Sequence, residues 1–316
     1  MKVLITGAGG FVGDALCRRL YASKHRVIGT FRTEPAPRDW METQTTGDLT
    51  QFADFKKVVE NADVVIHLAA RAHMTRDTVA ASDTEFRRAN IEVTQRLAQA
   101  AADSGAGRFI FLSSVKVNGE ETSGVPFSEV DVPAPEDSYG RSKRDAEDAL
   151  CHIAATTKMS VTTLRVPLVY GPSVRANFAA LIRICDTILP LPLGGISQNR
   201  RSFLYLGNLT HAIEAVVSSE SDPSGTYFLS DQMDLSTADL VDHLRSSLNR
   251  QTFRLPLSSA MLRSIGALAG KQATVRRLCG SLQVDSTAFQ KAFGWTPPFS
   301  PVQGIAATVA EHRKRR

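Results

Sequence analysis

The first half of the chain alternates between short apolar runs and stretches whose apolar residues recur at helical spacing. The apolar runs, rich in β-branched and aromatic residues, lie at 2–7, 25–31, 62–70, 108–114 and 161–166. Helical patterns lie at about 11–23, 51–60, 83–104 and 137–157. Strands without polar alternation are typical of a parallel sheet that is covered on both faces. We therefore predict an α/β fold with a doubly wound parallel sheet of the Rossmann type.

After about residue 166 this rhythm ends. Pro167, Pro172, Pro190 and Pro192 divide the chain into short pieces. A helix at roughly 208–219 is expected to return to the first domain, and further helical patterns lie at 236–248 and 284–295. The pattern indicates a larger domain of residues 1–166, to which 203–220 return. Residues 167–316 would form a smaller C-terminal lobe.

The composition is that of a soluble globular protein, with 43% apolar and 22% charged residues. No apolar run approaches the ~20 residues that a membrane-spanning helix needs. The N-terminal sequence "MKVLITGAGG" leads straight into the first predicted strand, without the pattern of a secretory signal. We therefore expect a cytoplasmic protein without membrane insertion.

The cysteines and the charge distribution narrow the classes of partner. Cys17, Cys151, Cys185 and Cys279 are too far apart for a metal-binding motif, so we expect reduced cysteines and no metal site. The net charge of +5 comes partly from the ending "HRKRR", which we expect to be a frayed terminus. No basic stripe is interleaved with aromatic residues, so nucleic acid is not an expected partner. An anionic small molecule suits the excess of arginine better.

A glycine-rich turn, "TGAGGFVG" at 6–13, connects the first strand to the first helix. Gly7, Gly10 and Gly13 stand three residues apart. Such a turn needs positive φ at one position and close backbone approach at the others, and the helix that follows presents free N–H groups to a diphosphate. At the first strand-to-helix turn of an α/β pattern, this spacing predicts a dinucleotide-binding site.

The end of the second strand leaves the choice of dinucleotide open. NAD-binding domains usually carry an acidic residue there, but this chain has Phe31 and Arg32. Arg32 could pair with the 2′-phosphate of NADP, stack over the adenine or point into water. NAD(H) and NADP(H) are therefore both candidates. Asp48 in "GDLT" could accept a hydrogen bond from the adenine amino group, or cap a helix that starts near Gln51.

Tyr139 and Lys143 in "DSYGRSK" fall on one face of the predicted helix at 137–157. A tyrosine with a pKa of about 10 must become more acidic by roughly 3 units to exchange a proton near neutral pH. Lys143 and an oxidised nicotinamide could supply that effect. Ser113 and Ser114 end a strand at the edge of the sheet that would bear the ligand, so a serine hydroxyl could bind the reacting oxygen.

These motifs together resemble the extended short-chain dehydrogenase/reductases, in particular the NAD-dependent epimerase/dehydratase family that includes UDP-glucose 4-epimerases. The resemblance covers nearly the whole chain. The matching segments are "TGAGGFVG", "GDL", "HLAA", "FLSSVKVNG", "YGRSK", "LRVPLVYGP", "NRRSFLYLGNL" and "FGWTP".

The resemblance implies roles for the catalytic and cofactor-binding positions. Ser114 would orient the sugar oxygen, Tyr139 would be the acid and base, and Lys143 would be its electrostatic partner. The cofactor-binding positions would be Gly7, Gly10, Phe11, Val12, Gly13, Arg32, Asp48, Leu49, Leu68, Ala69, Ala70, Tyr139, Lys143, Pro167 and Val169.

The resemblance also makes residues 167–316 a nucleotide-sugar-binding lobe. Besides Ser114, the substrate-binding positions would be Asn177 and Arg201 at the diphosphate, Leu193 in the loop over the uracil, and Arg276 as a second arginine for the diphosphate. Asn90 matches a family asparagine on the helix that faces the active site, and a structural role is the alternative. Arg71 and His73 could touch the sugar or lie on the surface.

The expected reaction occurs at carbon 4 of a UDP-hexose. Family members that act as 4,6-dehydratases carry an Asp-Glu pair where this chain has Val115 and Lys116, so dehydration is not expected. The role of Lys116 stays open, and a solvated side chain is one reading. The first interpretation is a UDP-glucose 4-epimerase-like enzyme.

Alternative functions remain open. One is an NADPH-dependent 4-ketoreductase of a UDP-4-keto-6-deoxy-(N-acetyl)hexosamine in surface-polysaccharide synthesis, which Arg32 would favour. Another is a non-catalytic dinucleotide-binding sensor, which the presence of both Tyr139 and Lys143 disfavours. The resemblance further implies a homodimer that pairs through the helices at 83–104 and 137–157.

Overall fold

A parallel sheet of seven strands organises the larger part of the molecule. The computed structural model describes residues 1–71, 79–188, 190–221, 224–252 and 272–314, with isolated positions between 253 and 271. The strand order is β3-β2-β1-β4-β5-β6-β9, and every neighbouring pair is parallel. The strands are β1 (Lys2–Thr6), β2 (Arg26–Phe31), β3 (Glu42–Thr45), β4 (Val64–His67), β5 (Arg108–Ser114), β6 (Ser160–Val166) and β9 (Gly225–Phe228).

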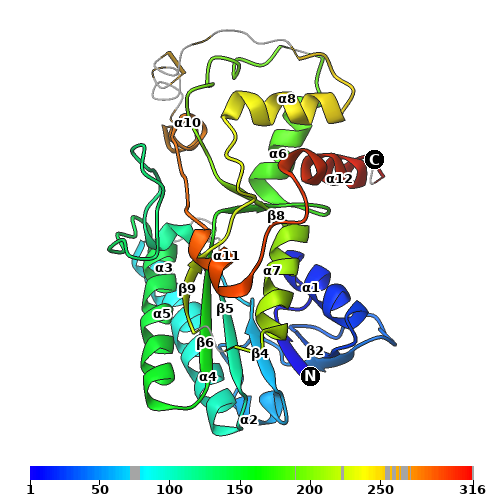
Figure 1. The fold of residues 1–316 in the computed structure, drawn as a ribbon, viewed down its shortest axis with the longest axis vertical. Coiled ribbons are helices and arrows are strands. Elements are labelled where there is room, and N and C mark those ends of the chain that lie inside the picture. The colour runs from blue at the N-terminus through cyan, green and yellow to red at the C-terminus, as the bar shows by residue number, and fades with distance from the viewer. Residues whose placement is uncertain are drawn as a thin grey trace.

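Helices cover both faces of this sheet (Figure 1). One face packs on α1 (Phe11–Ala22) and α7 (Leu206–Ser218), which also contact each other. The other face packs on α2 (Phe55–Val59), α4 (Val93–Asp103) and α5 (Ser138–Thr156). Before α4 come α3 (Val79–Phe86) and a π-helical turn, η1 (Arg87–Glu92), and the helix α11 (Thr287–Phe293) contacts β9. The structure thus confirms the doubly wound α/β fold.

The remaining elements form a second cluster, drawn above the sheet in Figure 1. A two-stranded parallel sheet pairs β7 (Leu168–Tyr170) with β8 (Phe203–Tyr205). Around it lie α6 (Ala176–Cys185), α8 (Thr237–Ser247) and α12 (Pro301–Lys314), whose apolar side chains share one core. A further helix, α10 (Gln272–Cys279), belongs to the same end of the molecule.

The described elements agree with most of the expected ones. All the predicted strands pair in the large sheet, but β3 and β9, one at each edge, were not predicted. The helix expected at 51–60 is only α2, because its cap is Asp54. For the described part of the ending "HRKRR", the expectation of a frayed terminus was wrong: α12 continues to Lys314, and its Ile305 and Val309 are buried in the core of the second cluster. None of the helices in the described part of the chain combines the length and the apolar character that a membrane span requires.

The order of the strands fixes where a ligand can bind. The chain leaves β1 toward one edge of the sheet and later returns to the other side of β1 as β4, so β1 and β4 flank the topological switch point. In open α/β sheets the ligand crevice lies beyond the carboxyl ends of the strands at this point. The glycine-rich turn follows β1, and the "HLAA" segment begins at the last residue of β4.

Candidate active site

The turn after β1 requires glycine at two positions. Gly7 has a φ of 73°, and a Cβ there would lie 3.0 Å from the backbone nitrogen of Ala69. A Cβ at Gly13 would overlap the carbonyl oxygen of Gly7. Gly10 precedes α1, and its N–H donates to the Gly7 carbonyl over 2.9 Å. The turn therefore lies directly against the segment that follows β4.

That segment is held to β1 by hydrogen bonds. The Leu68 and Ala69 N–H groups donate to the Thr6 carbonyl and to Thr6 Oγ1, over 3.3 and 3.4 Å. Thr6 Oγ1 also hydrogen-bonds His67 Nδ1 over 2.6 Å, and burial lowers the pKa of His67 to about 3, so this histidine is neutral. The glycine turn and the backbone of Leu68 and Ala69 thus meet close to the start of α1. These residues fit a dinucleotide, whose diphosphate needs close backbone approach and free helix N–H groups.

The end of β2 would contact the adenosine half of such a cofactor. Phe31 is buried against the glycine turn, with a ring carbon 3.2 Å from the position of a Cβ at Gly9, whereas Arg32 is exposed. Arg38, which the sequence motifs did not single out, stacks over the Phe31 ring at 5.4 Å and pairs with Asp14 over 2.6 Å. Both basic side chains therefore lie near the end of β2.

Asp48 does not cap a helix, so this structural alternative was wrong. Its carboxylate accepts the Thr50 N–H over 2.9 Å, whereas α2 begins later and is capped by Asp54. The Thr50 hydrogen bond, followed by smaller effects that include the charge of Arg32, holds the pKa of Asp48 below its ordinary value. Asp48 is exposed. An exposed, ionised carboxylate at this position keeps the proposed contact to an adenine amino group open.

Gly140 explains how Ser114 and Tyr139 come to the same edge of the sheet. Ser114 ends β5 and caps a short 3₁₀ turn, η2 (Val115–Val117), and its Oγ accepts the Lys116 N–H over 3.3 Å. A Cβ at Gly140 would lie 2.5 Å from the carbonyl oxygen of Lys116. The first turn of α5 can therefore pack directly on η2 only with glycine at this position. Tyr139 lies on that first turn.

Lys143 lies deeper, under the edge of the sheet. Its ammonium group donates to the Leu112 carbonyl over 2.8 Å and lies 4.3 Å from the centre of the Phe111 ring. Burial lowers the pKa of Lys143 to about 7, and the charge of Glu147 offsets part of that effect. This lysine is fully enclosed at the inner end of the Tyr139–Lys143 face of α5.

The chain by itself does not lower the pKa of Tyr139, as the proposed proton exchange would require. Burial, followed by the charge of Asp137, raises the pKa of Tyr139 to about 12. Removing a phenol from water disfavours the phenolate unless a positive charge compensates. A bound, oxidised nicotinamide would have to supply compensation together with Lys143.

A buried network that the sequence did not reveal lies beneath these residues. Glu147, one turn after Lys143, forms an ion pair with Arg165 over 2.6 Å, and both side chains are about 7% exposed. Ser113 Oγ also donates to Glu147, and Arg165 donates to Asn118 over 3.0 Å. The network ties α5 to β5 and β6. The spacing of Tyr139, Lys143 and Glu147, four residues each, was the one available signal.

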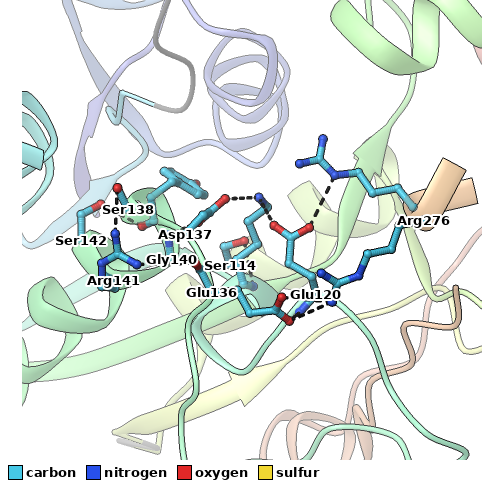
Figure 2. Close-up of polar contacts among 12 residues, drawn as sticks. Ser114, Glu120, Glu136, Asp137, Ser138, Gly140, Arg141, Ser142 and Arg276 are labelled. Carbon is cyan, nitrogen blue, oxygen red and sulfur yellow. Dashed lines mark hydrogen bonds and ion pairs between the residues drawn. The ribbon is translucent and has the colours of Figure 1, made fainter. Parts of the chain in front are cut away.

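The two arginines expected at the substrate diphosphate come from separate segments that both contact Gly280. Arg201 donates to the Gly280 carbonyl over 3.0 Å, and the Gly280 N–H donates to the Arg276 carbonyl over 2.8 Å. Burial lowers the pKa of Arg201. The Arg276 side chain reaches across to Glu136, 3.0 Å away and next to the start of α5 (Figure 2). Asn177 is exposed on the first turn of α6, and Leu193 is half-buried.

The other singled-out residues have mainly structural contacts. Asn90, in η1, accepts the Arg71 N–H over 2.8 Å and donates to Ser142 Oγ over 2.9 Å, so it fastens the segment after β4 to α5. Arg71 pairs with Glu85. Lys116, whose role the sequence left open, pairs with Glu120 and Asp137. His73 lies outside the described residues.

The remaining positions expected at the cofactor follow the fold. Phe11 and Val12 open α1, Ala70 follows the Leu68–Ala69 segment, and Leu49 packs at the edge of the core on the α4 and α5 side of the sheet. Pro167 is buried between β6 and β7, and Val169 lies on β7. All four cysteines are free, as expected.

Comparison with known proteins identifies relatives along the whole chain. The model of the NAD dependent epimerase/dehydratase family matches residues 3–229. A UDP-glucose 4-epimerase from Vibrio cholerae is 39% identical over 309 residues, which cover 98% of this chain and 94% of the relative.

Solved structures have the same fold. MoeE5, in complex with UDP-glucuronic acid and NAD, superposes with a TM-score of 0.78 at 25% identity over 100% of both chains. A UDP-glucuronic acid 4-epimerase from Bacillus cereus, in complex with NAD, gives a TM-score of 0.80 at 22% identity over 100% of this chain and 99% of its own. The sequence motifs, the sheet topology and these matches agree: the chain belongs to the NAD-dependent epimerase/dehydratase family.

Proposed function

We propose that this protein is an NAD-dependent epimerase acting at carbon 4 of a UDP-hexose. The observation that carries the proposal is the packing of α5 on η2 at Gly140, since it puts Ser114 and Tyr139 at the switch-point edge of the sheet. Support comes from the relative with 39% identity, a UDP-glucose 4-epimerase, and from neighbours solved with UDP-sugars and NAD.

The proposal divides the chain by role. Residues 1–166, with 203–220, would bind the dinucleotide through the positions named above, from Gly7 to Val169. Residues 167–316 would bind the nucleotide sugar, with Arg201 and Arg276 at its diphosphate, since cations and bidentate guanidinium groups suit that anion. Asn177 and Leu193 would complete the site.

The reaction needs a proton acceptor, a donor for the sugar oxygen and a redox group. Bound NAD supplies reversible hydride acceptance. Tyr139, as phenolate, takes the proton of the carbon 4 hydroxyl, and Ser114 holds the same oxygen by a hydrogen bond. Lys143 stabilises the phenolate because it lies on the same face of α5. After the 4-keto sugar rotates and presents its opposite face, Tyr139 returns its proton to the oxygen on carbon 4.

The chain also offers a reason against dehydration. Val115 has no titratable group, and Lys116 is paired with two carboxylates, so the places of an acid and a base beyond Ser114 carry neither. Elimination of water from the sugar needs such groups.

The test is turnover of UDP-sugars by the purified protein and its Tyr139→Phe variant. We expect wild-type protein to interconvert UDP-glucose or UDP-N-acetylglucosamine with the carbon 4 epimer, measured by chromatography of the products. Loss of general acid-base catalysis should slow the variant by ~10²- to 10⁴-fold. Tyr21→Phe, on the exposed side of α1, is the matched control and should be unaffected. Equal rates for Tyr139→Phe and wild type would disprove the assigned role.

A second candidate is an NADPH-dependent 4-ketoreductase. The observation that favours it is the pair of basic side chains, Arg32 and Arg38, near the end of β2, where a 2′-phosphate would lie. Nucleotide extracted from fresh protein separates the two functions. Stoichiometric bound NAD would support the epimerase, whereas an empty site that consumes added NADPH with a 4-keto sugar would support the reductase.

Homodimerisation through the helices at 83–104 and 137–157, and a cytoplasmic location, also stay predictions.

A further inference from the structure

Lys116 occupies a position between the catalytic serine and the catalytic helix. It lies on η2, two residues after Ser114, and its side chain is 29% exposed. Its ammonium group donates to Glu120 over 2.6 Å and forms an ion pair with Asp137, so it lies between two carboxylates. A lysine that makes two such contacts has a defined place.

Asp137 connects Lys116 to Tyr139. One carboxylate oxygen caps α5 by accepting the Gly140 N–H over 2.7 Å, and the other pairs with Lys116. Tyr139 follows two residues later, in the first turn of the helix. The Lys116 carbonyl also packs on Gly140. Lys116 therefore contacts the start of the tyrosine's helix through both its backbone and its side chain.

The charge of Asp137 works against the chemistry of Tyr139. Burial has the larger effect on the pKa of Tyr139, and the charge of Asp137 raises that pKa further. Burial also acts to raise the pKa of Asp137, but the Lys116 and Gly140 hydrogen bonds outweigh it and hold that pKa below its ordinary value. Asp137 is thus ionised at neutral pH, two residues before Tyr139 in the chain.

We propose that Lys116 is a positioning residue for proton exchange at Tyr139: its ammonium group fixes the Asp137 carboxylate at the start of α5 and neutralises that charge beside the phenol. The inference deepens the proposed function and depends on it for the role of Tyr139. It also gives a use to the lysine found where dehydratases of the family carry an acid.

Other charged groups near the start of α5 have partners of their own. On α3 and η1, the described pairs are Asp83 with Arg141, Glu85 with Arg71, and Arg87 with Glu92. On the loop between η2 and α5, Glu120 also pairs with Arg277, and Glu136 pairs with Arg276. Deeper groups are Lys143, Glu147 and Arg165; Arg88 on η1 is exposed. These pairings leave Asp137, balanced by Lys116, as the charge that acts most directly on Tyr139.

The experiment is a pH titration of the NAD-loaded protein that follows tyrosinate absorbance near 295 nm. Subtracting the same titration of a Tyr139→Phe partner isolates the midpoint of Tyr139. We expect Lys116→Met to raise that midpoint by about one pH unit, because it leaves Asp137 uncompensated. Lys116→Arg should keep the wild-type midpoint. Lys158→Met, beyond the other end of α5, is the matched control and should change nothing.

Asp137→Asn completes the cycle. Asparagine can still cap the helix, so the variant removes the charge and keeps the fold. We expect it to lower the midpoint, and we expect Lys116→Met to have no further effect in the Asp137→Asn background. The pH dependence of kcat should shift in parallel, with little change in KM. An unchanged midpoint in Lys116→Met, or an equal shift in the Asp137→Asn background, would overturn the proposal.

The titration also separates this inference from the proposed function. It reports the proton of Tyr139 whether or not any sugar is turned over. If the Tyr139 midpoints shift as predicted but the protein epimerises no UDP-sugar, the role of Lys116 stands and the assigned reaction is rejected. If the protein epimerises UDP-sugars but the Tyr139 midpoints do not change in the variants, the assigned reaction stands and the role of Lys116 is rejected.

Discussion

Helix α5 carries two adjacent carboxylates, Glu147 and Asp148, and each pairs with an arginine. Glu147 points inward and binds Arg165 of β6, with both side chains about 7% exposed. Asp148 lies on the outer face and binds Arg144, one turn earlier on the same helix, over 2.9 Å, with side chains 59% and 35% exposed. The chemistry of the two pairs is the same, and only their surroundings differ.

The difference in burial decides what each pair does. Ions taken out of water lose their hydration, so a buried charge that loses its partner is costly, whereas an exposed pair competes with water and contributes little. Glu147 also accepts a hydrogen bond from Ser113 and raises the pKa of Lys143 against the effect of burial. The inner pair therefore supports the candidate active site, and the outer pair is a feature of the surface.

The largest expected effect follows from breaking the inner pair. Glu147→Gln would leave the buried Arg165 without a counter-charge and should lower the free energy of unfolding by about 3 to 5 kcal/mol. Urea denaturation followed by circular dichroism measures it. Glu147→Gln combined with Arg165→Met should recover much of the loss, because no buried charge remains unpaired. A loss under about 1 kcal/mol in the single variant would contradict the assigned burial.

Lys143 gives a pH-dependent version of the same test. Its pKa in the folded protein, about 7, is below the ordinary 10.5, so the unfolded chain binds more protons between these values. Stability therefore rises with pH in this window, by up to about 1.4 kcal/mol per pH unit from this group. Lys143→Met removes that contribution. The stability difference between variant and wild type should be largest near pH 7 and shrink by pH 9; a constant difference would contradict a buried, poorly charged lysine.

The smallest effect is expected on the outer face. Asp148→Asn should change the free energy of unfolding by no more than about 0.5 kcal/mol, as is usual for exposed i,i+4 pairs. The remaining effect should disappear in 1 M salt, because mobile ions screen exposed charges. The same denaturation experiment, with and without salt, measures it. A salt-resistant loss comparable to that of Glu147→Gln would remove the distinction between the two faces.

The sequence predicted the large sheet better than its edges. The buried strands β1, β2, β4, β5 and β6 have continuous apolar runs, and all were expected. The edge strand β3 reads "ETQT", which has no apolar signal because it is mostly exposed. The C-terminal helix α12 was missed since its basic end masked the buried Ile305 and Val309. Elements whose burial depends on distant neighbours carry weak local signals.

In the candidate site, too, the sequence predicted the features that depend on local patterns and missed those that depend on contacts between distant residues. The glycine turn and the Tyr139–Lys143 spacing are local patterns, set by the backbone needs of one turn and by the period of one helix. Together with the other matching segments along the chain, they were sufficient to predict the family. The sequence alone could not indicate that Lys116 pairs with Asp137, 21 residues later, or Glu147 with Arg165, 18 residues later.

By itself, then, the sequence indicated the buried strands of the sheet, the glycine turn and the Tyr139–Lys143 pair, because each depends on residues close together in the chain. The tertiary structure decided which charges are buried and which partners neutralise them. The reason is physical: the energy of a charge depends on its distance to other charges and to water in three dimensions, and the packing of α5 on β5, β6 and η2 sets those distances.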